Sequence, residues 1–192
     1  ITFIPPTPPS MTLTAVGDLI MHMPIVNSAF SPEEATYDFR PVFSSIKEGL
    51  SAADFTVGVL ETSLTGDKDK YSGYPRFYTP YQLGNALKWA GFDLVFTAHN
   101  HSLDQGVKGI KSTLSYLETI NLPSTGSRRK IQEKPYYLVE VNGIKLAFFS
   151  YTTLTNGLSP PANQRWILNI IDYYKLAWEI AQVKQAGDRK ST

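Results

Sequence analysis

Three short apolar runs, each ending in a side chain that can bind a metal, constrain the fold of this chain more than any other feature. Runs at residues 13–16, 55–60 and 94–96 lead into Asp18, Glu61 and the segment Thr97-Ala98-His99-Asn100-His101. Runs of this length are typical of buried strands. Open α/β sheets bind their ligands at the carboxyl ends of their strands. The pattern therefore predicts an α/β domain whose strands bring these polar side chains to one edge of a sheet.

The residue types at this edge predict a metal site. Carboxylate oxygens, an amide oxygen and imidazole suit hard or borderline divalent cations such as Mn²⁺, Fe²⁺ or Zn²⁺. The alternative is a polar loop at residues 97–106 in which Asp104 caps the next helix and Gly106 makes a turn. That alternative explains two residues but neither histidine, so we favour the site. His22 is a further candidate ligand, although packing against Met21 or Met23 explains it better.

The remaining periodicity predicts helices between and after these strands. Helices are expected over residues 41–50, over 81–90 with a stop at Gly91, from about Val107 to Leu117, and over 170–185. Asn142-Gly143 joins two β-rich runs, which is the strongest short signal of a hairpin. Together these elements predict a mixed sheet within one α/β domain, residues 11–192. Residues 1–10 are rich in proline and are expected to form an extended lead-in or tether.

Composition excludes several classes of function. The 192 residues are 42% hydrophobic, which suits one globular unit, and the net charge of +1 provides no field that would attract nucleic acid. The run Arg128-Arg129-Lys130 is interpreted as a solvated loop rather than a phosphate-binding patch. The chain has no cysteine, so disulfides and thiolate metal sites are excluded. Neither a Gly-x-Gly-x-x-Gly fingerprint nor a Walker lysine motif opens any helix.

Several motifs in combination resemble a bacterial family that acts in capsule and poly-γ-glutamate synthesis, called CapA or PgsA. They are Gly17-Asp18, Leu60-Glu61-Thr62, Tyr74-Pro75-Arg76-Phe77 and Ala98-His99-Asn100-His101-Ser102-Leu103-Asp104-Gln105-Gly106, and the resemblance extends from about Met11 to near Gly187. The family is similar to the calcineurin-like metallophosphoesterases. The resemblance implies a metallophosphoesterase-like α/β sandwich with a dinuclear metal site at its strand ends.

The resemblance also assigns roles to individual residues. It implies that Asp18, Glu61 and Asn100 bind the metal ions, with Glu61 bridging them, and that His101 is the proton donor or stabilises the transition state. The candidate substrate-binding residues are Arg76, His22 and His99. Arg76 is equally well explained by an ion pair with Asp67 or Asp69. The sequence departs from the family pattern at Val59 and His99, where asparagine is usual.

The resemblance implies that the family domain continues beyond Thr192. Family members carry further histidine motifs, of the His-Trp-Gly and Gly-His-His-Pro-His kind, and no histidine follows His101 here. The α/β fold is therefore expected to be incomplete at its C-terminus. Family members often have an N-terminal membrane anchor, so the resemblance implies an extracytoplasmic domain that is anchored through a segment absent from this chain.

Two hypotheses for function follow from the resemblance. The first is a metal-dependent phosphoesterase-type hydrolase in capsule or poly-γ-glutamate synthesis. The second is a non-catalytic component of the cell envelope that binds or guides an anionic polymer, or supports a membrane synthase. The expected partners are thus an anionic polymer or a phosphoester substrate, and membrane synthase subunits, but no nucleic acid.

Overall fold

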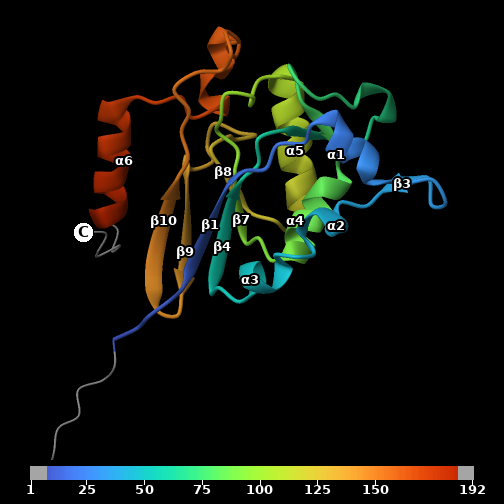
Figure 1. Cartoon of the computed structure of the whole chain (residues 1–192). Helices are drawn as coiled ribbons and strands as arrows, with labels where there is room; N and C mark the ends of the chain where they lie inside the picture. Colours follow the sequence, from blue (N-terminus) through green and yellow to red (C-terminus); the bar gives the residue numbers. More distant parts are fainter. Residues whose placement is uncertain (1–7, 186–192) are drawn as a thin grey trace, which may run out of the picture.

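A four-stranded parallel sheet forms the centre of the molecule. The computed structural model describes residues 8–185, so most of the proline-rich lead-in lies outside the described residues. The strands are β1 (Leu13–Asp18), β4 (Phe55–Val59), β7 (Leu94–Phe96) and β8 (Ser124–Thr125), in the order β1-β4-β7-β8 (Figure 1). The three predicted strands are confirmed. Strand β8 was not predicted, because its two polar residues form no apolar run.

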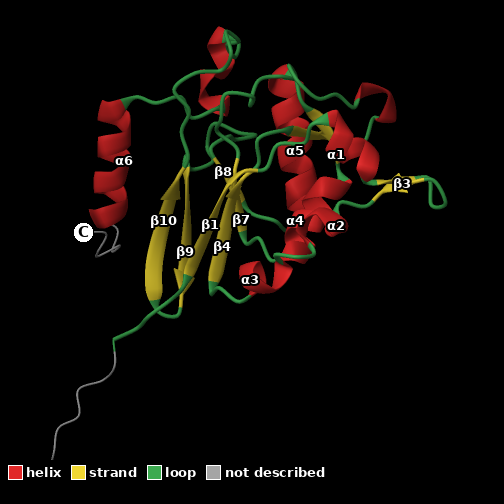
Figure 2. Cartoon of the chain, viewed as in Figure 1, coloured by secondary structure: helices red, strands yellow, loops and turns green. Residues whose placement is uncertain are grey.

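Helices cover one face of this sheet and enclose the main core (Figure 2). They are α1 (Met23–Ser28), α2 (Arg40–Phe43), α3 (Lys47–Ser51), α4 (Gln82–Ala90) and α5 (Gly106–Thr119). Leu83 and Leu87 of α4 pack with Val95 of β7 and Leu117 of α5. The predicted end of α4 is confirmed, because Gly91 adopts the left-handed conformation, with φ at 103°.

The single helix predicted for residues 41–50 is wrong. The segment forms two short helices, α2 and α3, that are separated at residues 44–46. Phe43 and Leu50 are buried, whereas Val42 and Ile46 are 40% and 47% exposed. Only two of the four apolar residues of the expected stripe therefore reach the core.

An antiparallel hairpin covers the other face of the sheet. It consists of β9 (Tyr136–Val141) and β10 (Ile144–Phe149), joined by the predicted Asn142-Gly143 turn, whose φ angles are 50° and 78°. Phe148 stacks on Phe55 of the sheet with ring centroids 5.4 Å apart. Parallel and antiparallel strands are thus both present, as predicted, but they form separate ladders rather than one mixed sheet. The layers confirm an α/β fold consistent with the metallophosphoesterase-like class.

Short elements complete the described fold. They are β2 (Phe30–Ser31), β3 (Thr36–Tyr37), β5 (Ser63–Thr65), which is parallel to β6 (Tyr78–Pro80), and the 3₁₀ helices η1 (Lys68–Lys70) and η2 (Ala162–Ile167). Helix α6 (Tyr173–Gln185) lies beside the hairpin, away from the other helices (Figure 1). Within residues 8–185, no helix is both long enough and apolar enough to cross a bilayer.

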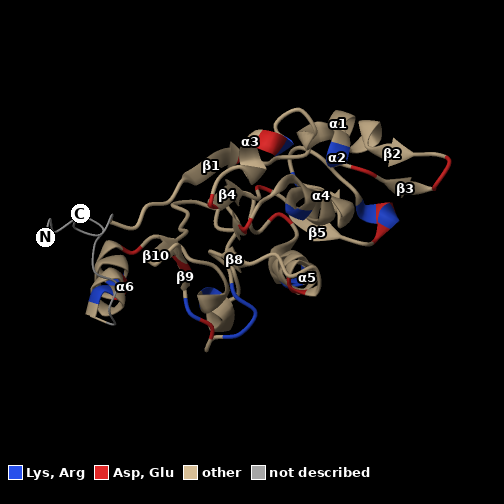
Figure 3. Ribbon diagram, turned by 90° about the horizontal axis from the view of Figure 1, so that it is seen from below, with Lys and Arg blue, Asp and Glu red and all other residues tan. Residues whose placement is uncertain are grey.

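Two arginines of the basic run at residues 128–130 are buried or paired, not solvated as the sequence suggested. Figure 3 shows basic and acidic positions close together around this loop. Arg129 forms an ion pair with Glu118 of α5, and Arg128 is buried. Burial lowers the pKa of Arg128, and the nearby Glu179 of α6 opposes this effect. The interpretation of the run as a solvated loop is therefore wrong for Arg128, which is buried.

Candidate metal and acid–base site

Two acidic side chains meet where β1 and β4 end. A bulge between Val16 and Asp18 shifts the register, so that Asp18 lies opposite Val59. The Glu61 N–H donates to the Leu19 carbonyl at 3.2 Å, which holds the segment after β4 against the segment after β1. Asp18 is exposed and Glu61 is only 8% exposed. The sheet therefore brings these two predicted ligands together.

The environment of Glu61 favours its protonated form. Burial raises the pKa of Glu61, and the negative charge of Asp18 and a hydrogen bond between the two side chains raise it further. His101 opposes this effect and Asp104 adds to it, so both lie within electrostatic range of Glu61. Two carboxylates held this close repel each other unless a proton or a cation lies between them.

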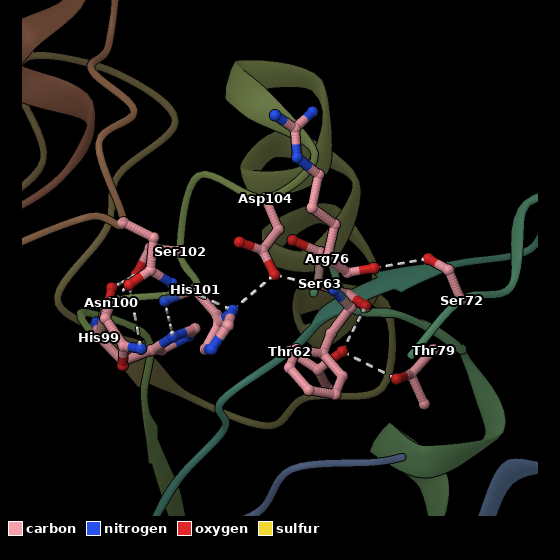
Figure 4. Close-up of polar contacts among 12 residues, drawn as sticks. Thr62, Ser63, Ser72, Arg76, Thr79, His99, Asn100, His101, Ser102 and Asp104 are labelled. Carbon is pink, nitrogen blue, oxygen red and sulfur yellow. Dashed lines mark hydrogen bonds and ion pairs between the residues drawn. The ribbon is translucent and has the colours of Figure 1, made fainter. Parts of the chain in front are cut away.

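His101 and Asp104 form a buried pair beside these carboxylates. Nδ1 of His101 lies 2.8 Å from Oδ2 of Asp104, and the backbone N–H of Phe77 donates to the same oxygen at 2.8 Å (Figure 4). Because a carboxylate accepts hydrogen bonds, the proton shared by the pair belongs on Nδ1. This arrangement leaves Nε2 as the ring nitrogen that can exchange a proton with a ligand.

Phe77 fixes the His101 ring from the side. Its side chain is 1% exposed, and its ring meets His101 edge-on with centroids 4.8 Å apart. The exposed ring of His22 lies 5.1 Å from the Phe77 ring in a similar orientation. His22 therefore approaches the site through an aromatic contact that the sequence analysis did not identify.

The loop that carries the histidines is tied internally. Ser102 Oγ accepts from the His99 N–H at 2.8 Å and lies 2.9 Å from the Thr97 carbonyl, to which it can donate. His99 is half-buried, and its Nδ1 accepts from the His101 N–H at 3.1 Å. Burial lowers the pKa of His99 to about 3, helped by the charge of His101 and opposed by a hydrogen bond to the Leu60 backbone. His99 is thus a neutral side chain that braces the loop.

The interpretation of this segment as a helix cap is only half right. Gly106 makes the expected turn, with φ at 59°. The N-cap position of α5 is occupied by Gln105, whose side chain makes no capping hydrogen bond. Asp104 instead binds His101 and Phe77, so its carboxylate belongs to the site.

Asn100 and Arg76 lie at the margin of the site. The Asn100 amide faces Asn156, and within residues 8–185 it makes no hydrogen bond to Asp18 or Glu61. Arg76 is exposed, and its side chain extends away from the His101 ring (Figure 4). No ion pair of Arg76 occurs within the described residues, where Asp67 pairs with Lys70. The alternative of an ion pair between Arg76 and Asp67 or Asp69 is therefore wrong.

The donor set fits a divalent cation, although the described residues do not complete a metal site by themselves. Within residues 8–185, no three His, Asp or Glu side chains converge as metal ligands. Asp18 and Glu61 nevertheless supply adjacent carboxylates, and the pKa of Glu61 is raised by burial first and then by the negative charge of Asp18, a charge that a cation would compensate. Asp18 and Glu61 would hold such a cation, with the Asn100 side-chain oxygen as the third donor.

Three residues that contact His101 were not predicted to belong to the site: Asp104, Phe77 and Asn156. Asp104 stands three residues after His101, a spacing that could have indicated the pair. Phe77 was noted only as part of a motif, and its aromatic contacts depend on the path of the loop before β6. Asn156 is 55 residues from His101 in the chain, so no local signal could have placed it.

The fold and these contacts define a class of protein: an α/β domain with a carboxylate pair and a histidine–aspartate pair at the ends of its parallel strands. The sequence matches the family described as bacterial capsule synthesis protein PGA_cap over residues 12–189. The chain therefore belongs to the bacterial capsule synthesis family, as the resemblance implied.

Two curated relatives with capsule or PGA biosynthesis names agree with this assignment, and a further relative is uncharacterized. The chain is 32% identical to an uncharacterized protein of Sinorhizobium fredii, over 74% of this chain and 30% of the relative. It is 28% identical to the capsule biosynthesis protein CapA of Bacillus anthracis, over 74% of this chain and 34% of the relative. It is 25% identical to the PGA biosynthesis protein CapA of Bacillus subtilis, over 59% of this chain and 31% of the relative. The matched region thus spans about a third of the length of these relatives.

Proposed function

We propose that this chain carries the catalytic face of a metal-dependent phosphoester hydrolase that acts in capsule or poly-γ-glutamate synthesis. The observation that carries the proposal is that two pairs of side chains meet, Asp18 with Glu61 and His101 with Asp104. Asp18, His101 and Asp104 all lie within electrostatic range of Glu61. One pair offers negative charge to a cation, and the other offers a positioned proton.

Each pair has a distinct part in the proposed reaction. A divalent cation bound at the strand ends would supply Lewis-acid activation of the phosphoryl group and of the attacking water. At the strand ends, the ligands of such a cation would be Asp18, Glu61 and Asn100. Asp104 holds the proton on Nδ1 of His101, so that a protonated Nε2 can donate to the departing alkoxide. Phe77 limits the rotation of the imidazole ring.

The family supports a role at the cell envelope, where capsules are assembled. In this proposal the substrate is a phosphoester or a phosphorylated end of an anionic polymer, and membrane synthase subunits are the partners. Arg76 is exposed at the margin of the site, where its guanidinium can pair with a phosphate or carboxylate of such a ligand.

We expect the chain to hydrolyse a generic phosphodiester such as bis(p-nitrophenyl) phosphate in the presence of Mn²⁺, and Glu61→Gln to abolish this turnover. The substitution keeps the size of the side chain but removes the carboxyl group that would bind the cation beside Asp18. The matched control is Glu140→Gln on the exposed side of β9, which should keep the wild-type rate.

The same assay distinguishes the two hypotheses. Mn²⁺-dependent turnover that is lost only in Glu61→Gln supports the hydrolase. Retention of poly-γ-glutamate without any turnover would contradict it and support the polymer-binding component instead.

A further inference from the structure

A loop that follows the hairpin places one amide side chain against both Asn100 and His101. Oδ1 of Asn156 lies 3.5 Å from Nδ2 of Asn100, and Nδ2 of Asn156 lies 3.3 Å from Nδ1 of His101. These contacts join a segment after β10 to the segment after β7. Asn156 is the residue of this loop that contacts the candidate ligand and the candidate acid at once.

Asn156 is exposed, and hydrogen bonds on both sides of it restrain the loop that carries it. At its beginning, the Thr152 N–H donates to the Asn169 carbonyl at 3.0 Å, and Thr152 Oγ1 donates to the Leu154 carbonyl at 2.7 Å. The turn itself is closed by the Leu158 N–H, which donates to the Thr155 carbonyl at 2.9 Å, and by a hydrogen bond from the Thr155 hydroxyl to the Leu158 carbonyl.

We propose that Asn156 is a positioning residue that orients the Asn100 amide and restrains the edge of the His101 ring; this inference rests on the proposed function. Asn100 uses its amino group toward Asn156, which leaves its side-chain oxygen free. An oxygen is the end of an amide that a hard cation binds. Nδ1 of His101 donates to Asp104 and Nδ2 of Asn156 is itself a donor, so these two atoms form no hydrogen bond and Asn156 acts on the ring by contact alone.

A purely conformational role is the main competing explanation for an asparagine here. Asn156 and Gly157 have φ angles of 49° and 78°, and asparagine tolerates this left-handed region better than most residues. The chain offers a matched case in Asn142-Gly143 of the hairpin, with φ angles of 50° and 78°. Asn142 bonds the Asp54 carboxylate and takes no part in the candidate site.

Glycine substitutions at both positions separate the two explanations, because glycine keeps the left-handed backbone and removes the amide. In Asn156→Gly we expect the affinity for Mn²⁺ to fall about 10–100-fold, as is usual when a residue that orients a metal ligand is lost. We also expect the Asn100 side-chain amide signals and the His101 ring ¹⁵N signals of the metal-free protein to move in NMR spectra. Asn142→Gly should change neither the affinity nor these signals.

A second variant tests the hydrogen bond itself. Asn156→Asp keeps an acceptor for the Asn100 amide, so the Asn100 side-chain signals should stay close to their wild-type positions while those of His101 move.

The proposal is overturned if Asn156→Gly leaves the Asn100 and His101 signals where they are, as Asn142→Gly does. If the wild-type chain binds no Mn²⁺, the proposed function fails, and the NMR signals of the metal-free protein still decide the role of Asn156. If the signals move but the affinity for Mn²⁺ does not, the orientation of Asn100 is irrelevant to metal binding and the proposal is also overturned.

Discussion

Replacing His101 by alanine is expected to lower the rate of Mn²⁺-dependent phosphodiester hydrolysis about 10²–10⁴-fold, the usual contribution of a general acid or base. The reason is that Asp104 fixes the proton on Nδ1 and leaves Nε2 for the leaving group. Steady-state kinetics with a substrate that has a poor leaving group should show the loss in kcat. With a good leaving group, such as p-nitrophenolate, the loss should be smaller.

Binding of Mn²⁺ provides the control for His101→Ala. The proposed ligands are Asp18, Glu61 and Asn100, so the variant should bind Mn²⁺ nearly as well as the wild type. A variant that retains Mn²⁺ and turns over the substrate with the poor leaving group at the wild-type rate would contradict the role of His101.

Phe77→Ala is expected to destabilise the chain by about 3–5 kcal/mol, the range for truncation of a buried phenylalanine. The Phe77 ring is 1% exposed and lies between His22 and His101. Its loss removes packing and also releases the imidazole ring. Urea denaturation measures the first effect.

Tyr74 is the matched control for Phe77, because it is an aromatic residue of the same loop and is 76% exposed. Tyr74→Ala should change the free energy of unfolding by much less than Phe77→Ala. Equal effects of the two substitutions would show that Phe77 does not support the site by packing.

Much of the central fold could be predicted because its signals are local. The apolar runs of β1, β4 and β7, the glycine after α4 and the Asn142-Gly143 turn each depend on a few adjacent residues. The prediction failed where tertiary contacts decide the structure. Strand β8 has only two residues, and its pairing with β7 depends on where α5 directs the chain. The break between α2 and α3 likewise has no signal in the spacing of the apolar residues.

The site shows the same division. The parallel strands explain why Asp18 and Glu61 could be expected to meet, since residues that follow adjacent strands lie at one edge. The partners of His101 could not be predicted in this way. Asp104 accepts hydrogen bonds from His101 and from the Phe77 backbone, and Asn156 arrives from a loop beyond the hairpin. These contacts depend on loops whose paths are fixed only in the folded chain.

The central proposal is that Asp18 and Glu61, at the strand ends, would bind a divalent cation. A titration with Mn²⁺, monitored by calorimetry or electron paramagnetic resonance, tests this proposal most directly. The wild type is compared with Asp18→Ala and with the control Glu140→Ala, which removes a carboxylate on the hairpin. We expect saturable binding in the wild type and in Glu140→Ala, and its loss in Asp18→Ala. Equal binding in all three proteins, or no saturable binding in the wild type, would contradict the proposal.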